Sequence, residues 1–342
     1  MLSRFIQRHD HYQPALFWFA VFTLCWTLVL LYAGAYTTSI SAGMVFLDWP
    51  LSNSSIMPEG WWQNQDMRAE HSHRLLATTL GYLAIILSIW AFLRVDRKRV
   101  RQLAYGLLAL VVAQGLLGGL RVLYDKLNTG AETNVAGYTF RILHALGAEF
   151  TLCALAALAL VLSRRWKERQ CNLQSPVPSS VRSWGIAAVL ALVIQITLGA
   201  LMRHAGAGLA IPTFPLTPEG GVLPAVWSTP VALHWLHRLG AVIATIAILG
   251  FLGMLYGRSN TRRALLGSII GVIMLLALQI FLGAATVWTY KNPVMASTHM
   301  LVGALLLASV WTLTLQTFRL PKGSQELTNR RLPSTKQAQT TT

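Results

Sequence analysis

The chain has 342 residues, of which 54% are hydrophobic and only 12% are charged, whereas about a quarter of the residues in an ordinary soluble domain are charged. This composition excludes a soluble globular protein and predicts a protein embedded in a lipid bilayer. The formal net charge of +16 would favour a nucleic-acid partner in a soluble protein, but in a membrane protein Lys and Arg collect on cytoplasmic loops. The positions of the charges therefore decide between a nucleic-acid partner and membrane topology.

Eight apolar runs have the length of about 20 residues that crosses roughly 30 Å of hydrocarbon. They lie near residues 15–36, 74–93, 102–120, 142–162, 184–202, 236–257, 264–283 and 298–318. The first run has no small-residue cleavage site, so we expect a retained helix rather than a signal peptide. The pattern predicts an all-α polytopic membrane protein with eight transmembrane helices.

Basic residues gather in every second loop and at both ends of the chain. This arrangement puts 20 of the 28 Lys and Arg on one side of the membrane, which the positive-inside rule identifies as the cytoplasmic side. We therefore expect both termini in the cytoplasm, and membrane lipid rather than nucleic acid as a partner. The three cysteines, Cys25, Cys153 and Cys171, fall in two spans and a cytoplasmic loop, so we expect no disulfide on the outer face.

An internal repeat organises the sequence. A shift of 165 residues aligns residues 34–51 with 199–216 and residues 113–119 with 278–284. Each copy starts on the cytoplasmic side, so the repeat predicts two four-helix bundles with parallel topology. We assign residues 1–162 to the N-terminal half, 163–182 to a cytoplasmic linker, 183–320 to the C-terminal half and 321–342 to a disordered tail. Each half also has a long outer loop, which is either a lid or a plain aromatic belt at the membrane surface.

Four histidines begin the second, fourth, sixth and eighth predicted spans, each within about one turn of its outer end. They are His73, His144, His237 and His299. Ionisable side chains at membrane depth are costly and mark functional sites, and two facing imidazoles on neighbouring antiparallel helices of a bundle hold a haem iron well. The pattern predicts one haem in each half, with iron held by His73 and His144 and by His237 and His299.

Arginines directly follow the histidines of the second and sixth spans. Arg74 and Arg238 are placed to bind a haem propionate through the guanidinium fork. The alternative is that they extend to lipid headgroups.

The two halves differ beside these histidines. The first half has EHSHR at 70–74 and the second has HWLHR at 234–238, so Glu70 aligns with His234. If the helix has already begun there, Glu70 shares a face with His73 and reaches the edge of the macrocycle, where it acts as a general base or stabilises positive charge. The alternative is an ordinary acidic residue at a helix start.

These residues resemble the haem A synthase family of cytochrome oxidase assembly, over about residues 15–318. The resemblance rests on the repeated halves, the four histidines, E-x-x-H-R from Glu70 to Arg74, and the loop motifs G-x-x-x-x-D-W-P at 43–50 and G-A-G-L-A-x-P-x-F-P at 206–215. Many members have a cysteine pair in the first outer loop, which this chain lacks, so it resembles a cysteine-poor subgroup.

The resemblance implies an enzyme of the bacterial plasma membrane that oxidises the methyl group of haem O to a formyl group by successive hydroxylations, giving haem A. It implies that His73 and His144 hold the substrate haem, that His237 and His299 hold haem b, and that Glu70 is catalytic. It also implies haem O synthase and cytochrome oxidase subunits as partners, and an electron acceptor that the sequence does not identify.

Two other functions fit parts of this pattern. One is a diheme b-type electron-transfer protein, although histidine pairs near both membrane faces would then be expected. The other is a haem transporter, which does not require Glu70.

A few further polar residues lie in or near the spans. Glu149 belongs to a proton path or is a packed carboxylic acid, and we expect Gln114, Gln195 and Gln279 to bond between helices. His71 and His204 are expected at the surface, with His71 as a spare ligand.

Overall fold

A computed structural model describes residues 8–168 and 178–319, and in these ranges the chain forms α-helices and no β-strand beyond isolated bridges. Eight of the described helices are long and apolar enough to cross a membrane. They are α1 (Pro14–Ser39), α2 (Gln65–Arg94), α3 (Lys98–Leu123), α5 (Val135–Leu162), α7 (Ser179–His204), α8 (Thr229–Tyr256), α9 (Ser259–Trp288) and α10 (Pro293–Arg319). Short helices α4 (Lys126–Thr129), α6 (Arg164–Glu168) and η3 (Ala207–Leu209) lie in connecting segments. The prediction of an all-α, multi-pass membrane protein is confirmed.

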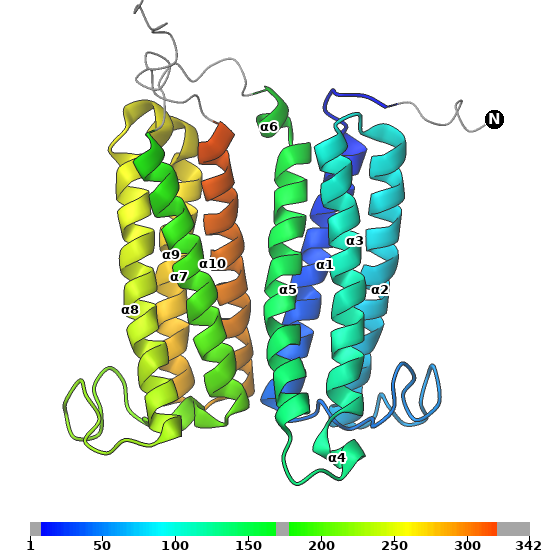
Figure 1. Cartoon of the computed structure of the whole chain (residues 1–342), viewed down its shortest axis with the longest axis vertical. Helices are drawn as coiled ribbons and strands as arrows, with labels where there is room; N and C mark the ends of the chain where they lie inside the picture. The colour runs from blue at the N-terminus through cyan, green and yellow to red at the C-terminus, as the bar shows by residue number, and fades with distance from the viewer. Residues whose placement is uncertain (1–7, 169–177, 320–342) are drawn as a thin grey trace, which may run out of the picture.

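The long helices stand in two groups, α1, α2, α3 and α5 in one and α7 to α10 in the other (Figure 1). Within the first group α1 and α3 each contact both α2 and α5, and within the second α7 and α9 each contact both α8 and α10. Helix α2 therefore lies diagonally across its group from α5, and α8 lies diagonally across from α10. All four of these helices begin at the end of the molecule that carries the long loops (Figure 1).

Each group has its own apolar core, and a third cluster joins the two groups. The joining cluster is made of small and medium side chains from α5 and α10, namely Leu152, Ala156, Ala304 and Ala308, with leucines of α1 against them. Small residues let helix backbones approach closely where lipid gives no hydrophobic driving force. Three bonds to main-chain carbonyls cross the same boundary: Tyr138 donates to Leu201 (3.0 Å), the indole of Trp311 donates to Cys153 (3.1 Å), and Arg203 donates to Ala35 (2.8 Å).

The helices begin earlier than the apolar runs, and in α2 the added first turns are polar. Helix α2 starts at Gln65 although its apolar run starts near 74, and the Asn64 side chain accepts the main-chain N–H groups of Asp66 and Met67. Ser228 accepts the N–H of Val231 at the start of α8 in the same way. Such caps satisfy the free N–H groups of a first turn. Within the expected linker, 169–177 lie outside the described residues, as does the expected tail at 321–342.

Candidate functional site

The four predicted histidines lie deeper in their helices than the sequence indicated. His73 and His237 are each the ninth residue after the capping residue of α2 and α8, so more than two helical turns precede them rather than about one. His144 and His299 also follow the starts of α5 and α10 by more than one turn. In α2 the added turns are polar, whereas α5, α8 and α10 begin with mostly apolar residues that lie before the predicted runs.

Each of the four imidazoles packs against a glycine on a neighbouring helix. A Cβ atom added to Gly34 would come within 2.6 Å of Cε1 of His73, and one added to Gly118 within 3.2 Å of Cε1 of His144. The corresponding distances are 3.0 Å from Gly199 to His237 and 3.1 Å from Gly283 to His299. Each ring also lies beside the main-chain carbonyl of the residue four positions before its glycine: Leu30, Gln114, Gln195 and Gln279. Each ring thus occupies the space left by the absent side chain of a glycine, and we call these four equivalent contacts the glycine seats.

The histidines form the two pairs that the sequence predicted. His73 and His144 are close enough to interact electrostatically, and so are His237 and His299. The paired helices, however, are diagonal and run in the same direction, so the expectation of neighbouring antiparallel helices was wrong. Diagonal helices of a four-helix bundle both contribute to its interior, so a ligand between two such histidines would be enclosed by all four helices.

The imidazole nitrogens are suited to bind the metal ion at the centre of a macrocycle. The Nδ1 atoms of His73, His144 and His299 are buried and make no hydrogen bond of normal geometry, and a buried imidazole nitrogen without a partner is costly unless a ligand binds it. Nδ1 of His237 instead lies 3.1 Å from the side-chain Nε2 of Gln195. Neutral imidazole is a standard axial ligand of haem iron, so this donor set fits haem in each half.

Glutamines of the odd-numbered spans contact the same region, as predicted for bonds between helices. The Gln195 amide donates to the main-chain oxygen of His237 (2.9 Å), and the Gln279 amide lies 3.4 Å from Nε2 of His299. The side-chain oxygens of Gln114, Gln195 and Gln279 are buried without a partner.

Glu70 is buried, with 4% of its surface exposed, and helix α2 has already begun at this position, so the condition for sharing a face with His73 is met. Its Oε2 accepts the main-chain N–H groups of Val45 (2.8 Å) and Phe46 (3.1 Å) from the loop between α1 and α2. Its Oε1 accepts from Arg74 (2.7 Å). The carboxylate therefore holds the outer loop against the bundle.

The second half performs the same anchoring with a different residue. Nδ1 of His234, which aligns with Glu70, accepts the N–H of Ile211 at 3.2 Å, and Ile211 aligns with Phe46 under the 165-residue shift. Both halves thus fix the outer loop through one side chain at the same place, but only the first half does so with a carboxylate.

Arg74 and Arg238 bind loop carbonyls. The Arg74 guanidinium donates to the main-chain oxygens of Phe46 (3.2 Å) and Asp48 (2.9 Å) in the first loop. Arg238 donates to Ile211 (3.0 Å) and Pro215 (3.4 Å) in the second. A propionate on either guanidinium would have to share it with these carbonyls.

The first outer loop is further ordered by Asp48. Its carboxylate accepts the main-chain N–H groups of Ser54 (2.7 Å) and Asn53 (2.8 Å). Burial raises the pKa of this carboxyl, but the two N–H bonds outweigh burial and hold the pKa below its ordinary value.

His71 is buried, with 3% of its surface exposed, so its expected surface position was wrong. Its Nδ1 lies 3.2 Å from the Ser52 hydroxyl, and its ring packs edge-on against Trp61. The loop folds over this ring, which hydropathy does not reveal. His204, the last residue of α7, is partly exposed and packs against Tyr138.

Glu149 lies on α5, inward from His144, and its Oε2 is buried without a partner. The nearest group that it influences is the Cys153 thiol on the same helix. Cys25 and Cys153 are free, and Cys171 lies outside the described residues.

One functional residue escaped the sequence interpretation. Arg121, in the last turn of α3, interacts electrostatically with His73, His144 and Glu70. The repeat contained a signal, because Thr286 stands at the aligned position in the second half.

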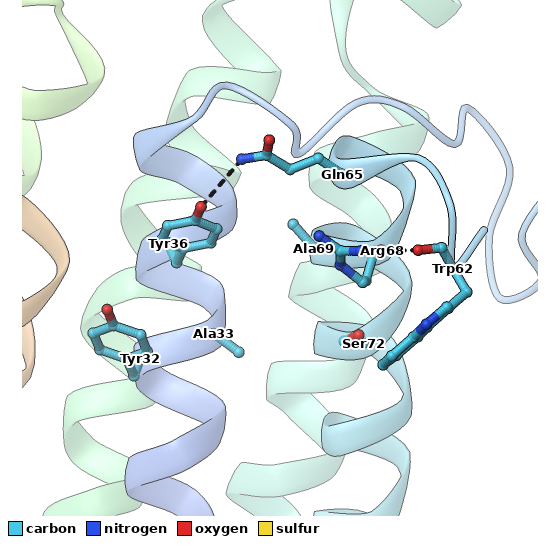
Figure 2. Close-up of a pocket in the computed structure, with 8 residues that line it drawn as sticks. All are labelled: Tyr32, Ala33, Tyr36, Trp62, Gln65, Arg68, Ala69 and Ser72. Atoms are coloured by element: carbon cyan, nitrogen blue, oxygen red, sulfur yellow. Dashed lines mark hydrogen bonds between the residues drawn. The ribbon is translucent and has the colours of Figure 1, made fainter. Parts of the chain in front are cut away.

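A cavity of about 320 Å³ lies on the outside of the first group, between the outer ends of α1 and α2. Figure 2 shows Tyr32 and Tyr36 of α1 facing Gln65 and Arg68 of α2, with a hydrogen bond of 3.2 Å from Gln65 to the Tyr36 hydroxyl. The four paired histidines and Glu70 are not among its lining residues. The cavity is therefore distinct from the histidine sites.

Comparison with known proteins identifies relatives of the chain. Residues 62–311 match the COX15-CtaA family, described as cytochrome oxidase assembly protein. The chain is similar to the protein named Heme A synthase of Symbiobacterium thermophilum, with 31% identity over 65% of this chain and 71% of that protein. Proteins of the same name from Geobacillus kaustophilus (28% identity, 90% and 94% covered) and Alkalihalophilus pseudofirmus (25% identity, 87% and 95% covered) are similar over nearly their whole length. The chain therefore belongs to the COX15-CtaA family of cytochrome oxidase assembly proteins.

Proposed function

We propose that this chain is a haem A synthase, an enzyme that oxidises the methyl group of haem O to a formyl group by successive hydroxylations. The relatives that match most of its length carry this name. The observation that carries the proposal is the asymmetry of two otherwise matched sites: paired histidines on glycine seats occur in both halves, but at the position three residues before the first histidine of each pair the first half has the buried carboxylate of Glu70 and the second has His234.

The architecture that we propose is two repeated four-helix bundles with parallel topology, at residues 1–162 and 183–320, joined by the linker at 163–182. The closed ring of contacts within each group supports the repeat. The equal distance from helix cap to histidine in α2 and α8 supports it further. The charge distribution favours a bacterial plasma membrane with both termini in the cytoplasm, which puts the histidines near the outer surface.

In this proposal His73 and His144 hold the substrate, haem O, in the first half, and His237 and His299 hold haem b in the second. A haem b held by His237 and His299 would supply redox chemistry, as a centre able to take up electrons. The glycine seats fix the orientation of the imidazoles, since any side chain on the glycines would displace the rings. Fixed ligand orientation is what keeps the reacting methyl group in one place relative to the protein.

Glu70 is the proposed catalytic group. Each hydroxylation takes its oxygen atom from water and releases protons and an electron pair from the methyl carbon and the water. Two main-chain N–H groups and the Arg74 guanidinium bind its carboxylate and fix its position. Glu70 can therefore stabilise positive charge that develops at the ring edge, and it can accept a proton at either carboxylate oxygen.

The haem content of membranes tests this function. Cells that make haem O but lack a haem A synthase are compared with and without this chain, by extraction, chromatography and mass spectrometry. We expect haem A or its hydroxylated precursor to appear. Haem O left unchanged beside well-expressed protein that contains haem B would instead favour an electron-transfer protein, and loss of haem from the cells into the medium would favour a transporter. Haem O synthase and cytochrome oxidase subunits are the partners that this function requires.

A further inference from the structure

Three arginines gather at the outer end of the first half, and only two of them have a carboxylate partner. Arg74 pairs with Glu70, and Arg141 pairs with Asp125. Arg121 makes no ion pair with any carboxylate of the described residues. Its Nη2 donates to the main-chain oxygen of Gly43 (2.6 Å), and its Nε is buried without a partner. Arg121 is therefore the one arginine of the three that makes no ion pair, although Glu70 and Asp125 both act on it electrostatically.

Arg121 is placed beside both predicted ligands of the substrate. It interacts electrostatically with His73 and His144, which face each other across the bundle. Gly43 allows this position, because a Cβ atom there would collide with the guanidinium. A lone guanidinium at the membrane boundary is costly without a counter-ion, and Glu70, the nearest acid, is already held by Arg74 and the loop.

We propose that Arg121 binds a propionate carboxylate of the haem substrate in the first half. This inference rests on the proposed function, since it takes the first half as the substrate site. A guanidinium with free N–H groups binds a carboxylate through parallel hydrogen bonds. The propionates are the only anionic groups at the edge of haem O, so they are the chemistry that the unpaired charge recognises.

In the second half Thr286 aligns with Arg121, and its hydroxyl bonds to its own helix at Leu282 (2.8 Å). The cation beside Gly208, which aligns with Gly43, is Lys291, and Lys291 is exposed. A cation as buried as Arg121 lies at another position: Arg203 of α7 acts electrostatically on His299 and donates to the main-chain oxygen of Ala35 (2.8 Å) and to the Ser39 hydroxyl (2.9 Å). The two halves therefore differ in where this cation lies, and Arg121 is the one that acts on both histidines of its pair.

Binding of haem O and of its dimethyl ester to full-length protein in lipid nanodiscs tests the proposal without turnover. The ester keeps the ring, iron and tail but has no charged propionates. Absorbance titrations compare the unchanged protein with Arg121→Gln, Arg121→Lys and the control Lys291→Gln. The same titration of His144→Ala identifies the part of the signal that comes from the first half.

The unchanged protein should bind the acid about ten- to a hundredfold more tightly than the ester at the first half, the range expected for charge-assisted hydrogen bonds. Arg121→Gln should remove this preference by weakening binding of the acid alone. Arg121→Lys should retain part of it, and Lys291→Gln should leave it unchanged. Equal binding of acid and ester by the unchanged protein, or equal loss of both in Arg121→Gln, would overturn the proposal. The titration does not require that haem A forms. If the first half prefers haem O to its ester but cells with the protein make no haem A, the proposed function would be rejected and the role of Arg121 would stand.

Discussion

The exchange of Glu70 for histidine separates the chemical role of this residue from its role in holding the outer loop. Glu70→His copies the solution of the second half, where Nδ1 of His234 accepts the N–H of Ile211. The variant therefore keeps an acceptor for the loop but removes the carboxylate. We expect Glu70→His to retain haem and to lose haem A formation.

The contacts of Glu70 set the expected change in folding free energy, and its proposed chemical role sets the expected change in rate. Glu70→Ala leaves the N–H groups of Val45 and Phe46 and the Arg74 guanidinium without their shared acceptor, and each orphaned buried group costs about 1–3 kcal/mol of folding free energy. Glu70→His satisfies one of these N–H groups, so we expect it to be about 1–3 kcal/mol more stable than Glu70→Ala. Loss of a general base lowers the rate by about 10²- to 10⁴-fold.

The assay measures haem A per unit of folded protein in membranes that supply haem O, with thermal unfolding of each purified variant as the control for the loop. His234→Glu, which places a second carboxylate in the other half, should not restore activity to Glu70→His. Production of haem A by Glu70→His at the level of the unchanged protein would refute the reasoning, because it would show that Glu70 only anchors the loop.

Three other changes test the surrounding structure. Gly34→Val should displace the His73 ring, from which an added Cβ would be only 2.6 Å away, and should remove haem from the first half, whereas Gly81→Val, with no neighbour within 4 Å, should leave the haem spectrum unchanged. Burial raises the pKa of Asp125, but hydrogen bonds from Leu127 and Asn134 and the nearby Arg141 outweigh burial and hold the pKa below its ordinary value of 3.8. The ionised carboxylate therefore stabilises the folded protein above about pH 4. This contribution to stability is lost as the pH falls through the lowered pKa. Thermal unfolding midpoints should therefore drop below that pH in the unchanged protein and less in Asp125→Asn. Gln195→Leu should shift the reduction potential of the second-half haem, measured by redox titration, because it removes the amide beside Nδ1 of His237; an unchanged potential would place that amide outside the ligand's environment.

The sequence predicted the features that depend on hydropathy and spacing. Eight apolar runs became eight helices, because a helix is the only open-ended element that satisfies its own backbone in lipid. The start of α2 was missed by about two and a half turns, because the Asn64 cap supports polar first turns that hydropathy does not register. The histidine pairs were predicted because two ligands at one depth, repeated in two halves, leave few other partners.

Features that depend on the path of the outer loops could not be predicted. Arg74 faces loop carbonyls, and His71 is covered by Trp61 of the loop, and neither contact has a periodic signal in the sequence. Arg121 was overlooked for a related reason: whether a cation is paired depends on which carboxylates the fold brings within reach. A comparison of the two halves position by position, with Thr286 opposite Arg121, would have singled it out.

The two halves share the arrangement of their paired histidines but differ in the charged residues near them. The seats of the histidines are the same in both, from the glycines that admit the rings to the side chain that fixes the loop above them. Two differences that bear on the proposed chemistry are Glu70 at the position of His234 and Arg121 at the position of Thr286. In the proposed function one supplies a carboxylate and the other a cation for an acidic substituent, so the first half would orient and oxidise a haem and the second half would hold one.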